Sequence, residues 1–299
     1  MSVLAALWGA SYMFIKVALD DVSPFVVVWV RLVLAALVLL PIAHHRGALS
    51  ELRPHLPTVL FLSIVQVAAP FLLITFGEKH IASSLAGILV ASAPIFTALL
   101  AFRLDRAELA TGWRLVGIML GIVGVVLLFG VDLSGDSAAL LGGLMVLLAS
   151  LGYAIGPFEM KRKLHGVQPV GIAAATMTLA ALLLTPIIPF VWPAQAPGLD
   201  TVASLLALGA GGTGIAFVLY YTLIAEIGPA RASMVGYIAP GFSIVYGVVL
   251  LGESLTVVAV GGLLLILAGS WLGAQGRLPR WLSRSEPSRS SAPAPVRAR

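Results

Sequence analysis

The feature that most constrains this chain is a series of long apolar runs that carry almost no charge. One of them is LVGIMLGIVGVVLLFG, residues 115–130. A helix needs about 20 apolar residues to cross the hydrocarbon core of a bilayer, and only helices and closed barrels satisfy their own backbone there. Apolar residues here are continuous rather than alternating, which excludes a barrel. The sequence therefore predicts an all-α integral membrane protein whose solvent is the lipid bilayer.

The composition agrees with a membrane protein and excludes several other classes. Of the 299 residues, 60% are hydrophobic and 10% are charged, whereas soluble domains have about 25% charged residues. There is no cysteine, which excludes disulfides and thiolate metal sites, and we expect neither a metal nor a cofactor. The positive charge lies between the apolar runs and in the tail, so we expect no nucleic-acid partner.

The apolar runs predict ten transmembrane helices. The first five are expected near Val3–Leu19, Pro24–Ala43, Pro57–Phe76, Ile81–Phe102 and Gly112–Gly130. The second five are expected near Ala138–Met160, Pro169–Val191, Thr201–Ala225, Ala230–Leu251 and Thr256–Ala274. A signal peptide is a rival interpretation of the first run, but no basic segment precedes it and no cleavage site follows it. Residues 276–299 are rich in Ser, Pro and Arg, which predicts a disordered basic tail.

The distribution of lysine and arginine predicts the orientation of the chain. With loops assigned alternately to the two sides, fifteen of the 18 cationic residues fall on the side of the N-terminus. Cytoplasmic loops of membrane proteins carry the excess of Lys and Arg. The sequence therefore predicts a multi-pass protein of the inner (cytoplasmic) membrane, with both termini in the cytoplasm.

An internal repeat aligns the two halves of the chain. A shift of 145 residues places Trp8 on Tyr153, Lys16 on Lys161 and Pro24 on Pro169. The repeats are residues 1–131 and 138–275, with five predicted helices each. Because five is odd, the two repeats must enter the membrane in opposite directions. Such inverted repeats are typical of secondary transporters, whose substrate site lies near the midplane. The predicted fold is therefore ten transmembrane helices arranged as two inverted five-helix repeats.

Two cations interrupt the first two apolar runs. Lys16 lies near a predicted helix end, where its side chain can snorkel to lipid headgroups, with Asp20 one turn further on. Arg31 lies seven residues past Pro24, about 10 Å into the second helix. A cation at that depth is costly unless it faces protein or water, and such residues usually mark transport pathways. We therefore expect Arg31 to face a cavity or an internal partner.

Aromatic and polar residues within the predicted spans are candidates for substrate contact. Trp8, Tyr12 and Lys16 recur every four residues, so they share one helix face. This face is interpreted as lining a cavity rather than as an interfacial aromatic belt, because Trp8 and Tyr12 lie mid-span. The other polar candidates are Gln66, Ser92, Tyr153, Tyr220 and Tyr237, some of which could instead bridge helices.

Prolines inside the spans predict bends. Pro94 and Pro240 occupy related positions in the two repeats, with one residue of slip. Helix interruptions are tolerated in a membrane where protein or water satisfies the freed backbone groups. We expect paired bends beside the pathway, the alternative being kinks that only shape packing.

Two further features leave alternatives open. Glu159 is the carboxylate nearest to a span interior and the candidate for proton coupling, although the adjacent Lys-Arg-Lys favours a cytoplasmic salt bridge. The small-xxx-small pairs Gly117–Gly121 and Gly269–Gly273 allow close helix packing. That packing could occur within one chain or between the two chains of a homodimer.

Several segments resemble the EamA module of the drug/metabolite transporter superfamily. The resemblance rests on WGASYMFIKVALDDVSPFVVVWVRLVLAALVLL (8–40), ASSLAGILVASAPIFTALLAF (82–102) and RASMVGYIAPGFSIVYGVVLLGESLT (231–256), and on the glycine-rich runs GWRLVGIMLGIVGVVLL (112–128) and VVAVGGLLLILAGSWL (257–272). It implies a central cavity surrounded by helices 1, 3, 4, 6, 8 and 9, with helices 5 and 10 packed together away from it. It also implies a carrier of amino acids, drugs or other metabolites, often outward. The second repeat departs from the module's pattern, with Tyr153 in place of Trp and Thr176 opposite Arg31.

Three function classes were compared. An intramembrane enzyme would need a nucleophile with a base, a metal pair or a buried acid dyad, and none of these motifs is present in the sequence. A phosphate-binding loop for ATP is also missing. A scaffold or receptor-like subunit is the alternative, but it has no need of an inverted repeat. The sequence therefore predicts a secondary transporter that exports a small metabolite by alternating access.

Overall fold

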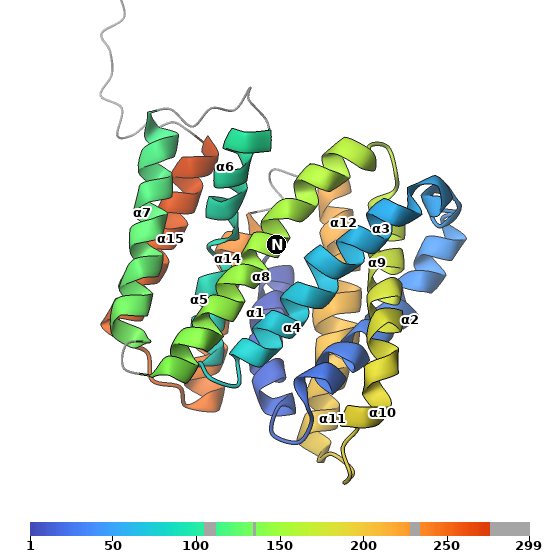
Figure 1. Cartoon of the computed structure of the whole chain (residues 1–299), viewed down its shortest axis with the longest axis horizontal. Coiled ribbons are helices and arrows are strands. Elements are labelled where there is room, and N and C mark those ends of the chain that lie inside the picture. The colour runs from blue at the N-terminus through green and yellow to red at the C-terminus, as the bar shows by residue number, and fades with distance from the viewer. Residues whose placement is uncertain (105–111, 134–135, 228–233, 276–299) are drawn as a thin grey trace, which may run out of the picture.

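The computed structural model describes residues 1–104, 112–133, 136–227 and 234–275 (Figure 1). Within these ranges the chain forms helices joined by turns and contains no strand. The predicted basic tail, 276–299, lies outside the described residues.

In the described part of the first 133 residues, the first two helices are continuous and the later segments are divided into shorter helices. In chain order they are α1 (Ser2–Ala18), α2 (Pro24–His45), the 3-10 helix η1 (Ser50–His55), α3 (Leu56–Leu62), the π-helix η2 (Ser63–Ala68), α4 (Ala69–Gly77), α5 (Ser83–Val90), α6 (Ala93–Leu104), α7 (Trp113–Leu127) and the π-helix η4 (Leu128–Asp132).

The second part of the chain also combines α-helices with short 3-10 and π-helical segments. Its helices are α8 (Ser137–Lys163), α9 (Pro169–Leu184), the 3-10 helix η5 (Thr185–Ile187), α10 (Ile188–Val191), α11 (Leu199–Leu206), the π-helix η6 (Ala207–Ile215), α12 (Ala216–Ile227), α14 (Val235–Leu251) and α15 (Val257–Gln275).

Seven helical segments of the described chain are long and apolar enough to cross a membrane. They are Pro24–His45, Ser50–Gly77, Ser83–Leu100, Trp113–Gly130, Ser137–Lys163, Pro169–Val191 and Leu199–Tyr220. Three shorter apolar helices accompany them, namely Ser2–Ala18, Val235–Leu251 and Val257–Gly273. Since many of the large apolar side chains on these helices are exposed, the chain is a multi-pass membrane protein whose outer surface suits lipid.

Proline fixes the start of two of the long helices. Pro24 and Pro169 each occupy the first helical position after an extended residue, as the sequence predicts. Proline is favoured there because its missing N–H has no partner in the first turn and its φ is already helical. These two helices, α2 and α9, pack against each other through buried side chains that include Leu32, Ala35 and Met177.

The glycine pairs of α7 and α15 pack against each other within one chain. Figure 1 shows α7 and α15 side by side at one end of the molecule, away from α2 and α9. A Cβ placed on Gly269 would lie 2.5 Å from the carbonyl oxygen of Gly117 and 2.5 Å from the nitrogen of Gly121. Only glycine permits this approach of two backbones. Of the two alternatives left open by the sequence, packing within the chain is the one observed.

Replacing Gly269 with valine is expected to destabilise the protein. The new side chain would meet backbone atoms of α7, which cannot move aside as a flexible side chain can. Overpacking of this kind costs about 1–3 kcal/mol. The thermal unfolding temperature in detergent measures the effect. Gly261→Val on the same helix is the matched control, because nothing lies within 4 Å of a Cβ at Gly261.

Three long segments depart from regular α-helix near their middle. The segment 50–77 contains the π-helix η2 directly before Pro70, and the run GAGGTG lies within the π-helix η6. The segment 83–104 is interrupted by a turn at 91–92, so that α6 starts just before Pro94. At Pro240, by contrast, α14 continues as one helix. Wider π turns often occur at functional sites, because they leave backbone groups and side chains out of helical register.

Candidate functional site

Arg31 lies inside the protein and is held by two neighbouring segments. Only 8% of the surface of Arg31 is exposed. The Nε atom donates a hydrogen bond of 2.8 Å to Oγ1 of Thr213 on η6, and the guanidinium carbon lies 3.7 Å from the ring centroid of Phe71 on α4. Thr213 itself donates to the carbonyl of Leu208, five residues earlier, at 2.9 Å. A hydrogen bond and a cation–π contact offset part of the cost of burying the charge.

Two tyrosines lie close enough to Arg31 to interact with it electrostatically. They are Tyr12 on α1 and Tyr153 on α8, and they also interact with each other. Gln66, on the π-helix η2, packs against Gly156, one turn after Tyr153, where a Cβ would overlap its amide group. Five segments therefore contribute to this central polar site, which we define as Tyr12, Arg31, Gln66, Tyr153 and Thr213.

Lys16 binds backbone carbonyls inside the protein. Its Nζ atom donates to the carbonyl oxygen of Glu78 at 2.6 Å and to that of Ile81 at 3.0 Å. These carbonyls follow the C-terminus of α4, where helical carbonyls lack partners and a cation is favourable. The snorkelling interpretation of Lys16 is therefore wrong, because its ammonium group satisfies an adjacent helix end instead of extending to headgroups.

Two carboxylates in this region, Glu78 and Glu253, are not predicted as site residues from the sequence. Glu78 is fully buried, with 0% exposure, and neither carboxyl oxygen has a hydrogen-bond partner among the residues that the structure describes. Glu253 accepts hydrogen bonds from the backbone nitrogens of Ser83 (2.7 Å) and Ser84 (2.9 Å), the first residues of α5. Burial acts to raise the pKa of Glu253, but these hydrogen bonds outweigh it and hold the pKa below its ordinary value. Both acids lie in loops between predicted spans. The loop after Phe76 has only four residues, and this shortness is the signal that could have indicated the burial of Glu78.

Trp8 belongs to an aromatic cluster between α1 and α12. Its ring centroid lies 5.2 Å from that of Tyr220 and 6.2 Å from that of Phe217. Thus the predicted face of α1 is used throughout its length, with Trp8 against aromatic rings, Tyr12 in the central polar site and Lys16 at the end of α4.

The other predicted residues lie elsewhere in the fold. Ser92 is buried and donates to the carbonyl of Leu89 at 2.6 Å, which stabilises the turn before Pro94. On α14, Tyr237 is half-buried, and the carbonyl of Pro240 accepts from Ser243 at 2.8 Å. No hydrogen bond or ring contact described for these residues joins them to the central polar site.

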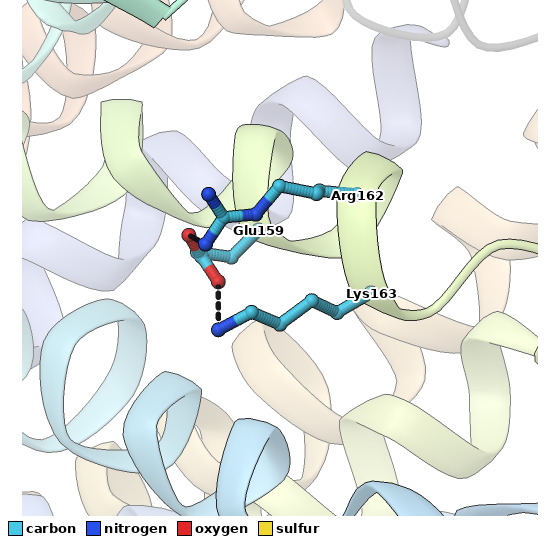
Figure 2. A network of polar contacts seen from close by, with 3 residues as sticks. All are labelled: Glu159, Arg162 and Lys163. Carbon is cyan, nitrogen blue, oxygen red and sulfur yellow. Dashed lines mark hydrogen bonds and ion pairs between the residues drawn. The ribbon is translucent and has the colours of Figure 1, made fainter.

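Glu159 makes two ion pairs at the end of α8. Figure 2 shows its carboxylate facing Arg162 and Lys163, at 2.6 Å and 2.8 Å. The spacings of three and four residues place all three side chains on one helix face. This geometry is the salt bridge that the adjacent Lys-Arg-Lys favours.

A cavity of about 220 Å³ lies beside the start of α5. It is lined by residues from three segments of the chain, including His80, Ile81, Ser84, Leu133, Ser254 and Thr256. None of the residues predicted for substrate contact lines it. The cavity instead adjoins Glu253, through Ser84 and Ser254.

Two exposed carboxylates join the predicted repeats across the ends of the bundle. Asp21 accepts from Oγ1 of Thr201 and from the nitrogen of Gly198, both at 2.7 Å. Glu51 accepts from the side-chain and backbone nitrogens of Gln168 at 3.0 and 3.1 Å. These hydrogen bonds hold the pKa of each carboxyl below its ordinary value. Both lie at the N-termini of helices, α11 and α9, where a negative charge is favourable.

Acid is expected to release these two connections. Because each folded pKa is lowered, the stability they contribute is present above the ordinary carboxyl pKa and is lost as the pH falls through the folded value. Thermal unfolding temperatures measured between about pH 5 and pH 2 should therefore decrease. In the double variant Asp21→Asn, Glu51→Gln the decrease should be smaller. An identical pH profile in the two proteins would contradict the assignment.

The comparisons with known proteins place the chain among transporters. The model of the EamA-like transporter family matches residues 1–130 and 140–273. The uncharacterized transporter YoaV of Bacillus subtilis is 27% identical, over 89% of this chain and 92% of its own. A probable amino-acid metabolite efflux pump of Salmonella typhimurium is 29% identical, over 92% of this chain and 93% of its own. A crystal structure with 20% identity matches 90% of this chain and 94% of its own with a TM-score of 0.66, which supports the fold alone.

Proposed function

Because the chain belongs to the EamA-like transporter family, we propose that it exports amino-acid-type metabolites across the inner membrane by alternating access. It is a small-solute transporter, since the family model covers both parts of the chain and its relatives are named transporters and efflux pumps. Export of an amino-acid metabolite is the activity named for the Salmonella typhimurium protein and for its Escherichia coli counterpart. No finding favours the alternative of a scaffold.

The observation that carries the proposal is the central polar site around Arg31. Within the described chain, the protein accepts a hydrogen bond from Nε of Arg31, while the terminal nitrogens of the guanidinium have no protein acceptor. A guanidinium edge of this kind binds a carboxylate in a bidentate manner. We therefore assign Arg31 to the substrate carboxylate, with Tyr12, Gln66 and Tyr153 as further polar contacts.

The remaining predicted residues are proposed to line or bend the same pathway. Trp8 and Tyr220 form one aromatic wall of it, at 5.2 Å from each other. Ser92 and Pro94 mark the break between α5 and α6, and Tyr237 and Pro240 are proposed as their counterparts on α14. Lys16 holds the end of α4 beside the site.

We propose that the three shorter helices also cross the membrane, which gives ten spans in two inverted repeats. The π-helices support this arrangement. Shifted by the repeat offset of 145 residues, η2 would cover 208–213, which lies inside η6. Arg31 and Thr213 would then come from opposite repeats, as the two walls of a midplane site require. Any homodimer would use the outer face of α7, where Leu115, Met119 and Val126 are exposed, because the glycine face is filled.

Transport is tested with the purified full chain in liposomes. A mixture of the proteinogenic amino acids in labelled form serves as the probe, and exchange of internal for external label is measured. Faster exchange than in protein-free liposomes supports the proposal. Exchange at the protein-free rate for every amino acid would contradict it.

The proposed orientation gives a separate expected result. A reporter enzyme fused after Arg299 should be active only if it functions in the cytoplasm, because ten spans with an inside N-terminus return the C-terminus inside. A matched fusion after Gly198, between α10 and α11, should report the opposite side. Periplasmic activity of the Arg299 fusion would overturn the topology.

A further inference from the structure

Glu78 has a buried carboxyl group whose charge is not stabilised by any described hydrogen bond. It is 0% exposed, and within the described part of the chain Oε1 and Oε2 have no hydrogen-bond partner, nor does the buried hydroxyl of Ser83 five residues later. Lys16 contacts this loop, but its ammonium group donates hydrogen bonds to two backbone carbonyls rather than to the carboxyl group. An ionised carboxylate without hydrogen bonds is costly in such a place, and the neutral acid is the form that burial favours.

Charged groups from several elements surround Glu78. Lys16 of α1, Arg31 of α2 and Glu253 after α14 all interact with it electrostatically, as does the phenol of Tyr12. From α8, the residues that face the end of α4 at Gly77 are Gly142 and Val146, which do not titrate. In its own loop, Lys79 and His80 are exposed.

The charge balance of this cluster depends on one proton. Glu253 is held ionised by the two N–H groups at the start of α5. With Lys16 and Arg31 charged, the cluster is neutral when Glu78 is ionised and carries one positive charge when Glu78 is protonated. A substrate carboxylate at Arg31 would supply the missing negative charge, so that the protonated form of Glu78 becomes the neutral one.

A cavity lies beside the connection that contains Glu78. The cavity of about 220 Å³ is lined by His80, Ile81 and Ser84 of the same connection. Ile81 also provides one of the two carbonyls that bind Lys16. The nearest of these lining residues therefore follows Glu78 closely along the chain, and water in this cavity is the proton donor that the proposal requires.

We propose that Glu78 is the proton-binding group of this transporter, and that it takes up one proton when a carboxylate-bearing solute occupies Arg31. The step is a proton transfer in which a hydronium ion in the cavity gives its proton to a carboxylate oxygen of Glu78 and leaves water. Release of the solute reverses it. The solute and the proton thus bind cooperatively and move in the same direction. Lys16 is a positioning residue, because its positive charge favours the ionised form of Glu78. This inference rests on the proposed function for the identity of the solute.

Protonation is tested first, without any solute. The full chain in nanodiscs is titrated with acid, and the carbonyl stretch of protonated carboxylic acids is followed by infrared difference spectroscopy. Because exposed carboxyls such as Asp21 and Glu51 also titrate, the expected result is one component of the band that is present in the wild type and absent from Glu78→Gln. Glu159→Gln is the matched control and should keep the band, since Glu159 is paired with two cations. A band in Glu78→Gln that is identical to the wild-type band at every pH would overturn the proposal.

A second measurement needs no variant at Glu78. Dicyclohexylcarbodiimide reacts with protonated carboxyl groups in apolar surroundings, and mass spectrometry of the wild type locates the adduct. Labelling of Glu78 that decreases as the pH rises is expected. Lys16→Met should move the midpoint of labelling upward by about 1–3 pH units, because a neighbouring cation favours the ionised carboxylate by that amount. No adduct at Glu78 at any pH would overturn the proposal.

Coupling is tested in liposomes loaded with the labelled amino-acid mixture and an internal pH indicator. Efflux through the wild type should remove protons with the solute, whereas Glu78→Gln should exchange solute without moving protons. Equal proton movement in both proteins would refute the coupling. If the wild type moves none of the amino acids, the proposed function fails, while the infrared and labelling results still decide whether Glu78 binds a proton.

Discussion

Replacing Arg31 with alanine abolishes transport while the protein remains folded and inserted. The substitution removes the guanidinium that we assign to the substrate carboxylate, along with its hydrogen bond to Thr213 and its contact with Phe71. Loss of one partner of a buried charged pair costs about 2–5 kcal/mol. Exchange of labelled amino acids should therefore fall by about 30-fold or more.

Two further variants separate substrate binding from structure. Arg31→Lys keeps the charge but loses the planar fork, so exchange should be intermediate. Thr213→Val removes the partner of Nε and leaves the terminal nitrogens in place, so its effect should be smaller than that of Arg31→Ala. The thermal unfolding temperature of each variant is measured in parallel. Wild-type exchange by Arg31→Ala would return Arg31 to a structural role.

Replacing Glu253 with alanine is expected to cause a large loss of stability. Its carboxylate is the acceptor for the first two N–H groups of α5, and it lies against Gly247 of α14. Leaving partly buried donors unsatisfied costs about 1–3 kcal/mol. The midpoint of thermal unfolding in detergent should therefore decrease clearly for Glu253→Ala and less for Glu253→Gln, which keeps one acceptor oxygen.

An exposed helix cap provides the comparison for Glu253. Asp136 accepts from the nitrogen of Ala138 at 2.8 Å at the exposed start of α8. Removing such a cap typically costs about 1 kcal/mol. Asp136→Ala should therefore be milder than Glu253→Ala, and a reversed order would show that the interaction between Glu253 and α5 contributes little.

The membrane class and the helix boundaries follow from simple features of the sequence. Continuous apolar runs determine the class, and Pro24 and Pro169 determine where two helices start. Arg31 was identified from its depth in an apolar run, and the structure gives it the internal partner Thr213. Thr213 itself lies in a glycine-rich run whose π winding depends on packing against α1 and α2, which no local pattern reports.

The interpretation of charged residues near helix ends was less successful. Lys16 could reach headgroups or a neighbouring helix end, and the choice depends on where α4 ends in space. Glu78 and Glu253 are not predicted as site residues. A sequence shows that each lies between two spans, but it does not show how deeply the connection is buried. Short loops between apolar runs are therefore the places where a charged residue is most easily misassigned.

A common feature of three carboxylates is that they accept backbone hydrogen bonds at the start of a helix. They are Asp21, Glu51 and Glu253. Each is a carboxylate that binds the N-terminus of a helix in the other predicted repeat, at Gly198, Gln168 and Ser83. The net contribution of such a hydrogen bond is small, because water replaces the lost partner. Because these connections consist of hydrogen bonds to carboxylates rather than of apolar packing, we expect the ends of the bundle to separate more easily than its apolar interior.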